Sequence, residues 1–274
     1  MPELPEVETI RKALEPVLLG KRVTAVTVRN PALRERVDEQ RLRGNVVGRQ
    51  VTGLERRGKL LLVHFEGETT LLVHLGMSGR LVVRQPGAPL EKHEHVIFDL
   101  ESSVQVRYRD PRRFGALIVL PTQKVATQPF VARLGPEPLD PRLDPRVLYR
   151  KLRTKRQPIK NALLDQRVLA GLGNIYTNEA LFRAGISPLR PAGDLSEAEV
   201  AHLLGSVRDV LREALNRGGT TLRDYADPEG NAGLFALELQ VYGRTGQPCP
   251  RCGAPIRTAR LAGRSTFWCE RCQK

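Results

Sequence analysis

The sequence predicts an α+β protein of several domains, in which a helix precedes an antiparallel β-sandwich or barrel, a helical region follows, and a four-cysteine module ends the chain. Three observations support this prediction. Short segments rich in β-branched residues fill residues 22–120. Longer segments with helical periodicity fill residues 146–217. All four cysteines lie after residue 248. We therefore expect four parts: residues 1–120, 121–145, 146–240 and 241–274.

The N-terminal helix is expected over residues 4–18, followed by Gly20 as a stop. Its apolar residues recur at helical spacing and form one stripe. Two prolines, Pro2 and Pro5, fall in the first turn, where a missing N–H breaks no intrahelical bond. The stripe comprises Leu4, Val7, Ile10, Leu14, Val17 and Leu18.

The sheet region and the helical region are separated by a proline-rich stretch. Residues 121–145 contain six prolines and predict a hinge. Four segments beyond it have helical patterns: "RVLYRKLR", "IKNALLDQRVLAG", "NIYTNEALFRAG" and "SEAEVAHLLGSVRDVLREALNRG". The last begins with Ser196 and has Glu199 three residues later, which is a capping box. A polar, glycine-rich loop follows at 218–240.

The charge of the chain favours a polyanionic partner. It has 274 residues with 44 Lys+Arg against 30 Asp+Glu, a formal net charge of +14. Nucleic acid is the commonest such partner, because neutralised phosphates release counterions. A basic protein without this partner remains an alternative. No apolar run approaches the roughly 20 residues that span a bilayer, and no secretory leader is visible, so we expect a cytoplasmic protein without a membrane partner.

The cysteines predict a metal site. They follow the pattern Cys249-x2-Cys252-x16-Cys269-x2-Cys272. Two CxxC pairs at this separation are typical of a structural site in which four thiolates hold one Zn²⁺. Arginine predominates around the site, which indicates a hairpin that presents cations to phosphate. A zinc knuckle that contacts another protein is the alternative.

Three turns carry side chains suited to nucleic acid. "GLGN" at 171–174 permits a tight turn whose N–H groups can seat a phosphate, although most such turns have no ligand. "DPRRFGA" at 110–116 places Arg112 and Phe114 at the tip of a turn, where an aromatic ring can wedge between bases or fold back into the core. "HLGMSG" is a similar turn with Met77, a residue that more often fills a core.

The first residues form a candidate nucleophile and acid. If Met1 is removed, Pro2 becomes the N-terminus, with an amine pKa of about 7.7–8.0. This secondary amine can attack an aldehyde-like carbon and form an iminium, which withdraws electrons from a neighbouring C–H bond. Glu3 stands beside it. If Met1 is retained, the nitrogen is an amide and no nucleophile exists. A helix that begins with Pro and Glu for structural reasons only is the alternative.

Taken together, the motifs resemble those of one family, bacterial formamidopyrimidine-DNA glycosylase, also called 8-oxoguanine-DNA glycosylase. The resemblance covers essentially the whole chain. It implies a β-sandwich catalytic domain over 1–120, a hinge, a helix–two-turn–helix DNA-binding domain with a lesion loop over 146–240, and a zinc finger over 241–274. The matching blocks are "PELPEVET", "RRGKLL", "HLGMSGRL", "DPRRFGA", "LAGLGNIYTNEALF" and "CPRC…FWCERC".

The resemblance implies a bifunctional glycosylase and AP lyase of base excision repair, a monomer that acts on double-stranded DNA beside the bacterial nucleoid. Pro2 would attack C1′ of an extruded oxidised purine nucleotide, and β,δ-elimination would leave a one-nucleotide gap. Glu3 would be the general acid/base. Lys59 matches a lysine implicated in proton transfer and phosphate contact. Arg264 resembles the zinc-finger arginine that grips the flanking phosphates.

The resemblance also implies the DNA contacts. Met77, Arg112 and Phe114 match the side chains that fill the hole left by the extruded base. The loop around Gly219 to Tyr225 matches the element that closes over the flipped purine. Five further residues align with DNA-contacting positions: His74, His93, Lys155, Lys160 and Asn174.

Three alternatives remain. An endonuclease VIII-like glycosylase would prefer oxidised pyrimidines, but its opening usually has Gly where this chain has Leu4. A non-catalytic zinc-finger DNA-binding protein would have no need of Pro2, Glu3 and Lys59. A zinc-ribbon factor of transcription or RNA would leave the N-terminus unexplained.

Overall fold

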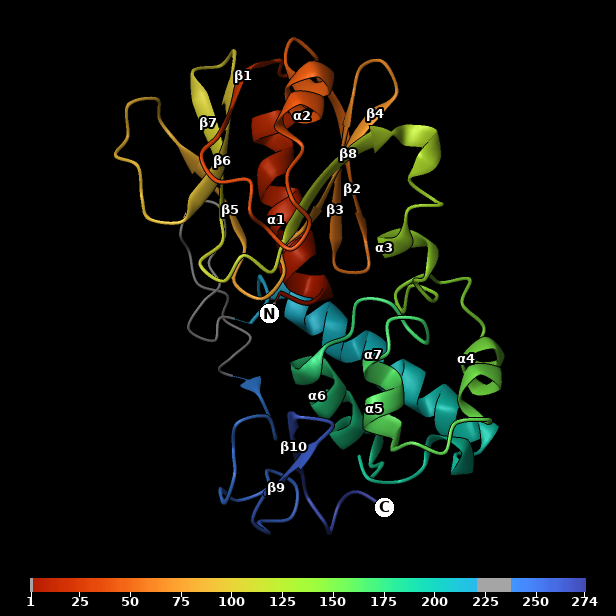
Figure 1. The fold of residues 1–274 in the computed structure, drawn as a ribbon. Helices are drawn as coiled ribbons and strands as arrows, with labels where there is room; N and C mark the ends of the chain where they lie inside the picture. The colour runs from red at the N-terminus through yellow and green to blue at the C-terminus, as the bar shows by residue number, and fades with distance from the viewer. Residues whose placement is uncertain (1, 221–237) are drawn as a thin grey trace. The chain divides into compact units, whose positions relative to one another are not determined.

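The computed structural model describes residues 2–220 and 238–274. By its internal contacts the chain forms two compact units, which we describe separately (Figure 1). Unit 1 comprises Met1–Ala132 with Arg217–Leu234, and unit 2 comprises Arg133–Asn216 with Phe235–Lys274.

Unit 1 contains the predicted N-terminal helix, α1 (Leu4–Leu18). Glu3 is its N-cap, and the side chains of Glu3 and Glu6 each accept the other's backbone N–H in a capping box. The predicted stripe is buried at Leu4, Val7, Ile10, Leu14 and Leu18. The helix is therefore fixed by its cap at one end and by apolar burial along one face.

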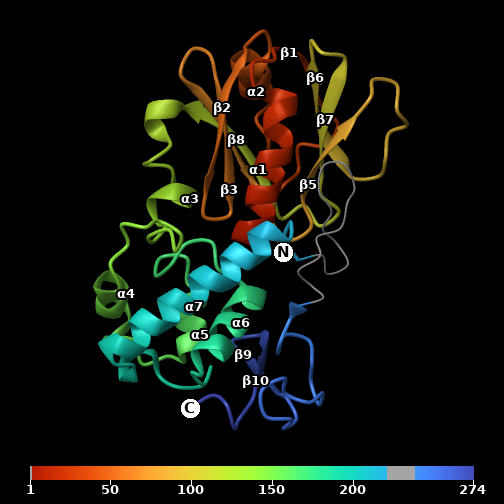
Figure 2. The same ribbon diagram turned by 180° about the vertical axis from the view of Figure 1, so that it is seen from behind.

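Two antiparallel sheets form the rest of unit 1, so the β region is a sandwich rather than a barrel. One sheet has the order β1 (Val23–Val28), β6 (Glu94–Leu100), β7 (Val104–Arg109), β5 (Arg80–Arg84). The other has the order β2 (Val51–Arg57), β3 (Leu60–Phe65), β4 (Thr69–His74), β8 (Ala116–Pro121). Figures 1 and 2 show the sheets on opposite sides of α1, with the short α2 (Glu39–Val46) near its C-terminal end.

One apolar cluster joins these elements into a single core. Ile10 and Leu14 come from α1, Leu61 and Val73 from one sheet, and Phe98 from the other. All five are buried, because α1 turns one apolar face inward and each strand places alternate side chains toward the interior. The core therefore holds the ends of both sheets in fixed positions, and the turns at those ends carry most of the candidate site residues of unit 1.

The proline-rich stretch contains only short helical turns. η1 (Thr122–Lys124) and α3 (Pro129–Ala132) precede the boundary between the units, and α4 (Pro145–Leu152) begins at the last of the six prolines. Asp144 caps α4 by accepting the N–H of Arg146 at 2.8 Å.

Unit 2 is helical, as expected, with α5 (Ile159–Leu164), α6 (Asn174–Ala184), η2 (Ala192–Asp194) and α7 (Glu197–Asn216) after α4. The capping box at the start of α7 is confirmed, since Glu199 accepts the N–H of Ser196 at 2.8 Å and Ser196 Oγ accepts the N–H of Glu199 at 3.3 Å. The helix expected over the whole of "IKNALLDQRVLAG" is wrong beyond Leu164. Asp165 there accepts the N–H of Arg167 at 3.0 Å, a local bond that competes with the helix.

The C-terminal segment contains one hairpin, β9 (Arg257–Leu261) and β10 (Arg264–Trp268). Its two-residue turn, Ala262–Gly263, has positive φ at both positions, 46° and 75°. Such a turn matches the twist of the two strands, and glycine adopts it without strain. Within the described ranges, no helix is both long enough and apolar enough to cross a membrane. The predicted polar loop falls largely on residues 221–237, outside those ranges.

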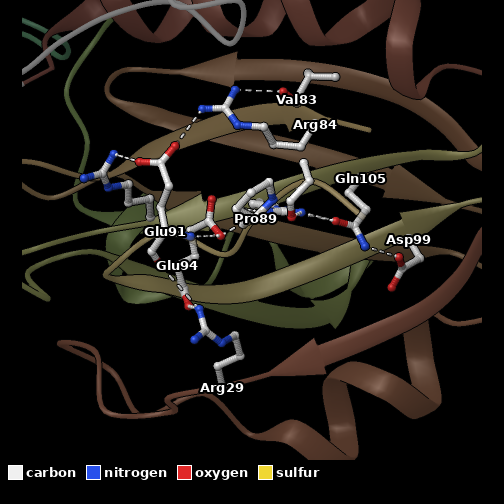
Figure 3. A network of polar contacts seen from close by, with 11 residues as sticks. Arg29, Val83, Arg84, Pro89, Glu91, Glu94, Asp99 and Gln105 are labelled. Carbon is white, nitrogen blue, oxygen red and sulfur yellow. Dashed lines mark hydrogen bonds and ion pairs between the residues drawn. The ribbon is translucent and has the colours of Figure 1, made fainter. Parts of the chain in front are cut away.

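A buried ion pair stabilises the β5–β7–β6 sheet and the loop that connects β5 to β6. Arg107 donates to Glu94 at 3.0 Å, and both side chains are about 1% exposed or less. Arg107 also donates to the carbonyls of Ala88 and Pro89 in that loop. Figure 3 shows Glu91 of the same loop beside Arg84, to which it is bonded at 3.1 Å. The loop is thus attached to the sheet at several points.

Replacing Glu94 with Leu should lower the free energy of unfolding by about 3–5 kcal/mol, because the charge of Arg107 would remain buried without its partner. The double variant Glu94→Leu/Arg107→Met should lose much less, since it buries no charge. Urea unfolding followed by circular dichroism measures both. The single variant Arg107→Met completes the cycle. If its loss and that of Glu94→Leu simply add in the double variant, the ion pair does not couple these residues.

Candidate active site

The two N-terminal candidate residues lie at the capped start of α1. Pro2 is buried and Glu3 is 2% exposed. The carboxylate of Glu6 accepts the N–H of Glu3 at 2.8 Å with one oxygen and the N–H of Thr220 at 2.8 Å with the other. The first residues of the chain are therefore held in a dry environment by hydrogen bonds, and Glu6 joins them to the segment after α7. Sequence reasoning missed this role of Glu6, although "PELPEVET" places it at the capping-box position.

Lys59 lies in the two-residue turn between β2 and β3, where Arg57 pairs with Leu60. Its side chain is only 8% exposed. Leu60 pairs in turn with His74 at the end of β4. The structure therefore brings Lys59 and His74 to the same end of the sheet, and the positive charge of Lys59 acts on the imidazole.

The imidazole of His74 is neutral at physiological pH. Burial, together with the charges of Arg34 and Lys59, lowers its pKa to about 4. Its Nδ1 atom accepts the N–H of Gly76 at 3.1 Å. A neutral imidazole that accepts at Nδ1 carries its proton at Nε2. His74 can therefore donate one hydrogen bond without adding a charge of its own.

The two turns predicted to wedge into nucleic acid do place their apolar residues in solvent. Met77, in the turn between β4 and β5, is 38% exposed, and Phe114, in the turn between β7 and β8, is 46% exposed. The guanidinium of Arg112 lies 4.8 Å from the centre of the Phe114 ring. Neither Phe114 nor Met77 folds back into the core, so these turns offer two apolar side chains and one cation.

In unit 2, Lys160 and Asn174 hold one strand of the hairpin. Lys160 Nζ donates to Ser265 O at 2.8 Å and to Thr266 Oγ1 at 2.7 Å. Asn174 Nδ2 donates to Ser265 O at 2.9 Å. Burial and the neighbouring charge of Arg264 lower the pKa of Lys160 to about 8. These two side chains therefore fix the position of β10 at the residue after Arg264.

Arg264 and Lys155 line one hollow of unit 2, beside α5 and the hairpin turn. The hollow also receives Arg156 and Arg167, against a single acid, Asp165. Asp165 is bonded to Arg167 at 2.9 Å, which leaves an excess of positive charge. A hollow with this composition suits phosphate groups.

Two residues of α6 that sequence reasoning missed attach the C-terminal segment to the helices. Glu179 accepts the N–H groups of Gln240, Val241 and Tyr242 at 2.8–3.0 Å, and burial raises its pKa. Asn178 Oδ1 accepts the N–H of Phe267 at 2.8 Å. The segment "NIYTNEALF" contains both residues between apolar ones, and the structure shows that they are buried.

The four cysteines converge, as predicted. Their sulfur atoms all lie within 4.8 Å of one another, with 3.8 Å between Cys249 and Cys272 and 3.5 Å between Cys252 and Cys269. Tetrahedral Zn²⁺ with Zn–S bonds of about 2.3 Å requires sulfurs about 3.8 Å apart. The cluster holds one structural Zn²⁺. Four protein ligands leave no position for water, so the ion stabilises the hairpin rather than activating a substrate.

Three family models match the chain in order. They are the formamidopyrimidine-DNA glycosylase N-terminal domain over residues 1–117, the formamidopyrimidine-DNA glycosylase H2TH domain over 134–226, and the zinc finger found in FPG and IleRS over 246–274.

Curated relatives match over nearly the full length. The formamidopyrimidine-DNA glycosylase of Moorella thermoacetica is 50% identical and covers 95% of each chain. That of Methylococcus capsulatus is 47% identical and covers 100% of each. Among solved structures, MutM (Fpg) of Thermus thermophilus has a TM-score of 0.89 at 41% identity, covering 99% of this chain and 98% of that chain. A complex of Lactococcus lactis Fpg with abasic-site DNA has a TM-score of 0.93 at 36% identity, covering 99% of each.

Removal of zinc should unfold the hairpin and expose Trp268. This residue is the single tryptophan of the chain, is 8% exposed, and precedes the ligand Cys269. A chelator should therefore shift the tryptophan emission to longer wavelength while the sheet signal of unit 1 in circular dichroism stays unchanged. Re-addition of zinc should reverse the shift. Loss of one zinc per chain with unchanged emission would contradict this role of the ion.

His74 should titrate at about pH 4 rather than near its ordinary value of 6.5. The fold stabilises the neutral form, so the contribution of His74 to stability is complete above pH 6.5 and is lost as the pH falls toward 4. NMR spectra of the imidazole nitrogens, assigned with His74→Gln, measure the midpoint. A midpoint above about pH 6 would show that neither burial nor the neighbouring cations act on this ring as described.

Proposed function

The chain belongs to the formamidopyrimidine-DNA glycosylase family, and we propose on this premise that it removes oxidised purines from double-stranded DNA and cleaves the resulting abasic site. Its substrates are 8-oxoguanine and formamidopyrimidines, and its pathway is base excision repair. The proposal rests on one observation: Pro2 and Glu3 are buried at the capped start of α1. The chain matches a formamidopyrimidine-DNA glycosylase over that enzyme's whole length.

Pro2 is the nucleophile. After removal of Met1, its secondary amine attacks C1′ of the damaged nucleotide, and the base departs with the electron pair of the glycosidic bond. Opening of the sugar then yields an iminium between Pro2 and C1′. Its positive charge acidifies the C2′ protons, so the 3′-phosphate and then the 5′-phosphate leave by β- and δ-elimination. The product is a one-nucleotide gap flanked by phosphates.

Glu3 is the general acid/base. Two observations support this role: Glu3 directly follows the nucleophile in the chain, and its burial restricts access of water. As helix N-cap it also accepts a backbone N–H, which fixes the position of the carboxylate beside Pro2. Lys59 assists proton transfer and contacts phosphate.

Base extrusion depends on the exposed turns of unit 1. A base inside a duplex is not accessible to an amine, so the nucleotide must be flipped out and the stack refilled. Met77 and Phe114 supply apolar bulk for the hole, and Arg112 supplies donors for the orphaned partner base. Their exposure supports this role, because neither side chain is committed to the core and both are free to enter a stack.

The remaining candidate residues hold the phosphates that flank the lesion. His74 offers one neutral donor, and Lys155 and Arg264 offer charges from the hollow of unit 2. We also assign DNA contact to His93, Lys160 and Asn174. Lys160 is fully buried, so its bonds and those of Asn174 to Ser265 support a contact made through the position of Arg264. The lesion loop lies mostly outside the described residues.

We divide the functions along the chain as follows. Residues 1–120 carry catalysis, 121–145 form the hinge, 146–240 bind DNA and contain the lesion loop, and 241–274 form the zinc finger. The order of the family models supports this division, and the boundary between the compact units after Ala132 falls within the hinge, although Arg217–Leu234 belong to unit 1. The protein acts as a monomer in the bacterial cytoplasm, beside the nucleoid that contains its substrate.

A panel of duplexes tests this function. We expect release of 8-oxoguanine and formamidopyrimidines well above that of oxidised pyrimidines, together with strand products that end in phosphate on both sides. With borohydride, the protein should become covalently joined to DNA that contains 8-oxoguanine, because reduction traps the iminium. Preferential release of oxidised pyrimidines would favour the endonuclease VIII-like alternative, and tight binding without any product would favour the non-catalytic one.

Two variants locate the chemistry. Pro2→Gly should reduce the trapped complex at least about tenfold, since the amine pKa and the ring geometry both change. Glu3→Gln should abolish release of 8-oxoguanine but still form the trapped complex with a ready-made abasic site, whose open aldehyde needs no departing base. Intact mass must first show that Met1 is absent, and trapping by protein that retains Met1 would rule out Pro2 as the nucleophile.

A further inference from the structure

One buried carboxylate is hydrogen-bonded to both exposed turns of unit 1 that carry candidate DNA contacts. These are the turn with Met77, between β4 and β5, and the turn with Arg112 and Phe114, between β7 and β8. Asp110 follows β7 and is 0% exposed. Its Oδ1 atom accepts Ser78 Oγ–H at 2.7 Å and the N–H of Arg112 at 3.3 Å. Its Oδ2 atom accepts the N–H of Gly115 at 2.9 Å and Tyr108 Oη–H at 3.2 Å. Ser78 follows Met77, whereas Arg112 and Gly115 flank Phe114, so the carboxylate contacts both turns.

The backbone of Asp110 extends the connection to a third loop. Its N–H donates to His93 O at 3.0 Å. Its carbonyl lies 2.8 Å from Nε2 of the buried His95, which donates to it. The loop before β6, with the candidate DNA contact His93, is therefore tied to the same residue.

The two exposed turns also approach each other without room for side chains. A Cβ atom on Gly76 would lie 2.4 Å from the carbonyl carbon of Phe114. A Cβ atom on Gly115 would lie 1.7 Å from Tyr108 Oη and 2.6 Å from His74 O. Both are shorter than any tolerated contact, so the turns pack backbone to backbone. The pairing of β4 with β8 and of β5 with β7 brings the turns together, and the hydrogen bonds to Asp110 connect them beyond the ends of the strands.

The four donors around Asp110 require a carboxylate. An ionised carboxylate only accepts, with about four lone-pair sites, and all four donors find one. Burial, reinforced by the charge of Asp110, raises the pKa of Tyr108, so its hydroxyl remains a donor. An asparagine would offer one acceptor oxygen and turn its own N–H groups toward donors.

We propose that Asp110, acting with Ser78, is a positioning residue that holds the Met77 turn and the Arg112–Phe114 turn as one rigid body, so that all three side chains enter the DNA stack together. The inference rests on the proposed function, because it assumes that these side chains fill the hole left by an extruded base. Ser78 Oγ lies 2.7 Å from Asp110 Oδ1 and 3.2 Å from the backbone nitrogen of Arg112, and so bridges the turns. Loss of this hydroxyl uncouples them without altering any of the inserted side chains.

The test uses a duplex with a tetrahydrofuran abasic analogue beside the fluorescent base 2-aminopurine. This duplex cannot undergo excision, so insertion of the wedge is measured even if base release fails. Ser78→Ala should slow the fluorescence rise that reports insertion by roughly tenfold, the effect of one lost buried hydrogen bond. Two duplexes, with cytosine or adenine opposite the abasic analogue, should also be bound with nearly equal affinity by this variant, because Arg112 loses its fixed direction.

Thr70→Val is the matched control. Thr70 Oγ1 is buried in the same unit and, like Ser78 Oγ, has two hydrogen-bond partners, Thr122 Oγ1 and His64 Nδ1, each at 2.9 Å. It should lower the melting temperature without changing insertion or the base ratio. Arg112→Ala should bring the cytosine-to-adenine binding ratio to one. The hydrogen bonds between the turns should remain, because its backbone N–H is kept.

A second variant, Asp110→Asn, should slow insertion more than Ser78→Ala does. If Ser78→Ala behaves like Thr70→Val, with a lower melting temperature and unchanged insertion and base ratio, the proposal is wrong and Asp110 only stabilises the fold. If the wild-type protein gives no insertion signal, the proposal is equally overturned. Absence of base release in the lesion panel, with insertion intact, would instead count against the proposed function alone.

Discussion

The reciprocal hydrogen bonds between Glu3 and Glu6 are the interaction on which the rest of the site depends. The end of a polypeptide is ordinarily the part least restrained by its fold. Here the capping box orders the first turn of α1, and burial of Leu4 and Val7 attaches that turn to the core. A reactive group at the terminus thereby gains the fixed position that covalent catalysis requires. Because Glu6 also accepts the N–H of Thr220, the same carboxylate restrains a segment from the other end of unit 1.

Among the described residues, some positive charges are paired with carboxylates and others are held by neutral groups. Arg107 and Arg167 are bonded to carboxylates, Glu94 and Asp165, and so contribute little net field. Lys160 is held instead by a carbonyl and a hydroxyl, which fix its position without cancelling its charge. Arg264 lies on the same strand as those acceptors. The hollow lined by Lys155, Arg156 and Arg264 therefore retains an uncompensated positive field for a polyanion.

Local patterns predicted much of this molecule. Apolar spacing predicted α1, the pair Ser196 and Glu199 predicted the start of α7, and cysteine spacing predicted the zinc site. The early end of α5 was not predicted, because the Asp165 bond that stops it does not interrupt the apolar pattern. The contacts of Asp110 could not be predicted from the sequence, for another reason. Three of its donors are near it in sequence, but Ser78 is 32 residues away, and only the long-range pairing of β5 with β7 and β4 with β8 brings it to Asp110.

The buried groups around Asp110 form a frame that is separate from the exposed side chains it positions, and this has a consequence for redesign. The frame consists of a buried carboxylate, a hydroxyl and two glycines that accept no substituent, whereas Met77, Arg112 and Phe114 project from it into water. Side chains that the frame does not pack against can be exchanged at little cost to folding. A library randomised at these three positions would therefore sample new lesion and partner-base preferences on an unchanged scaffold, while the frame itself offers almost no freedom to vary.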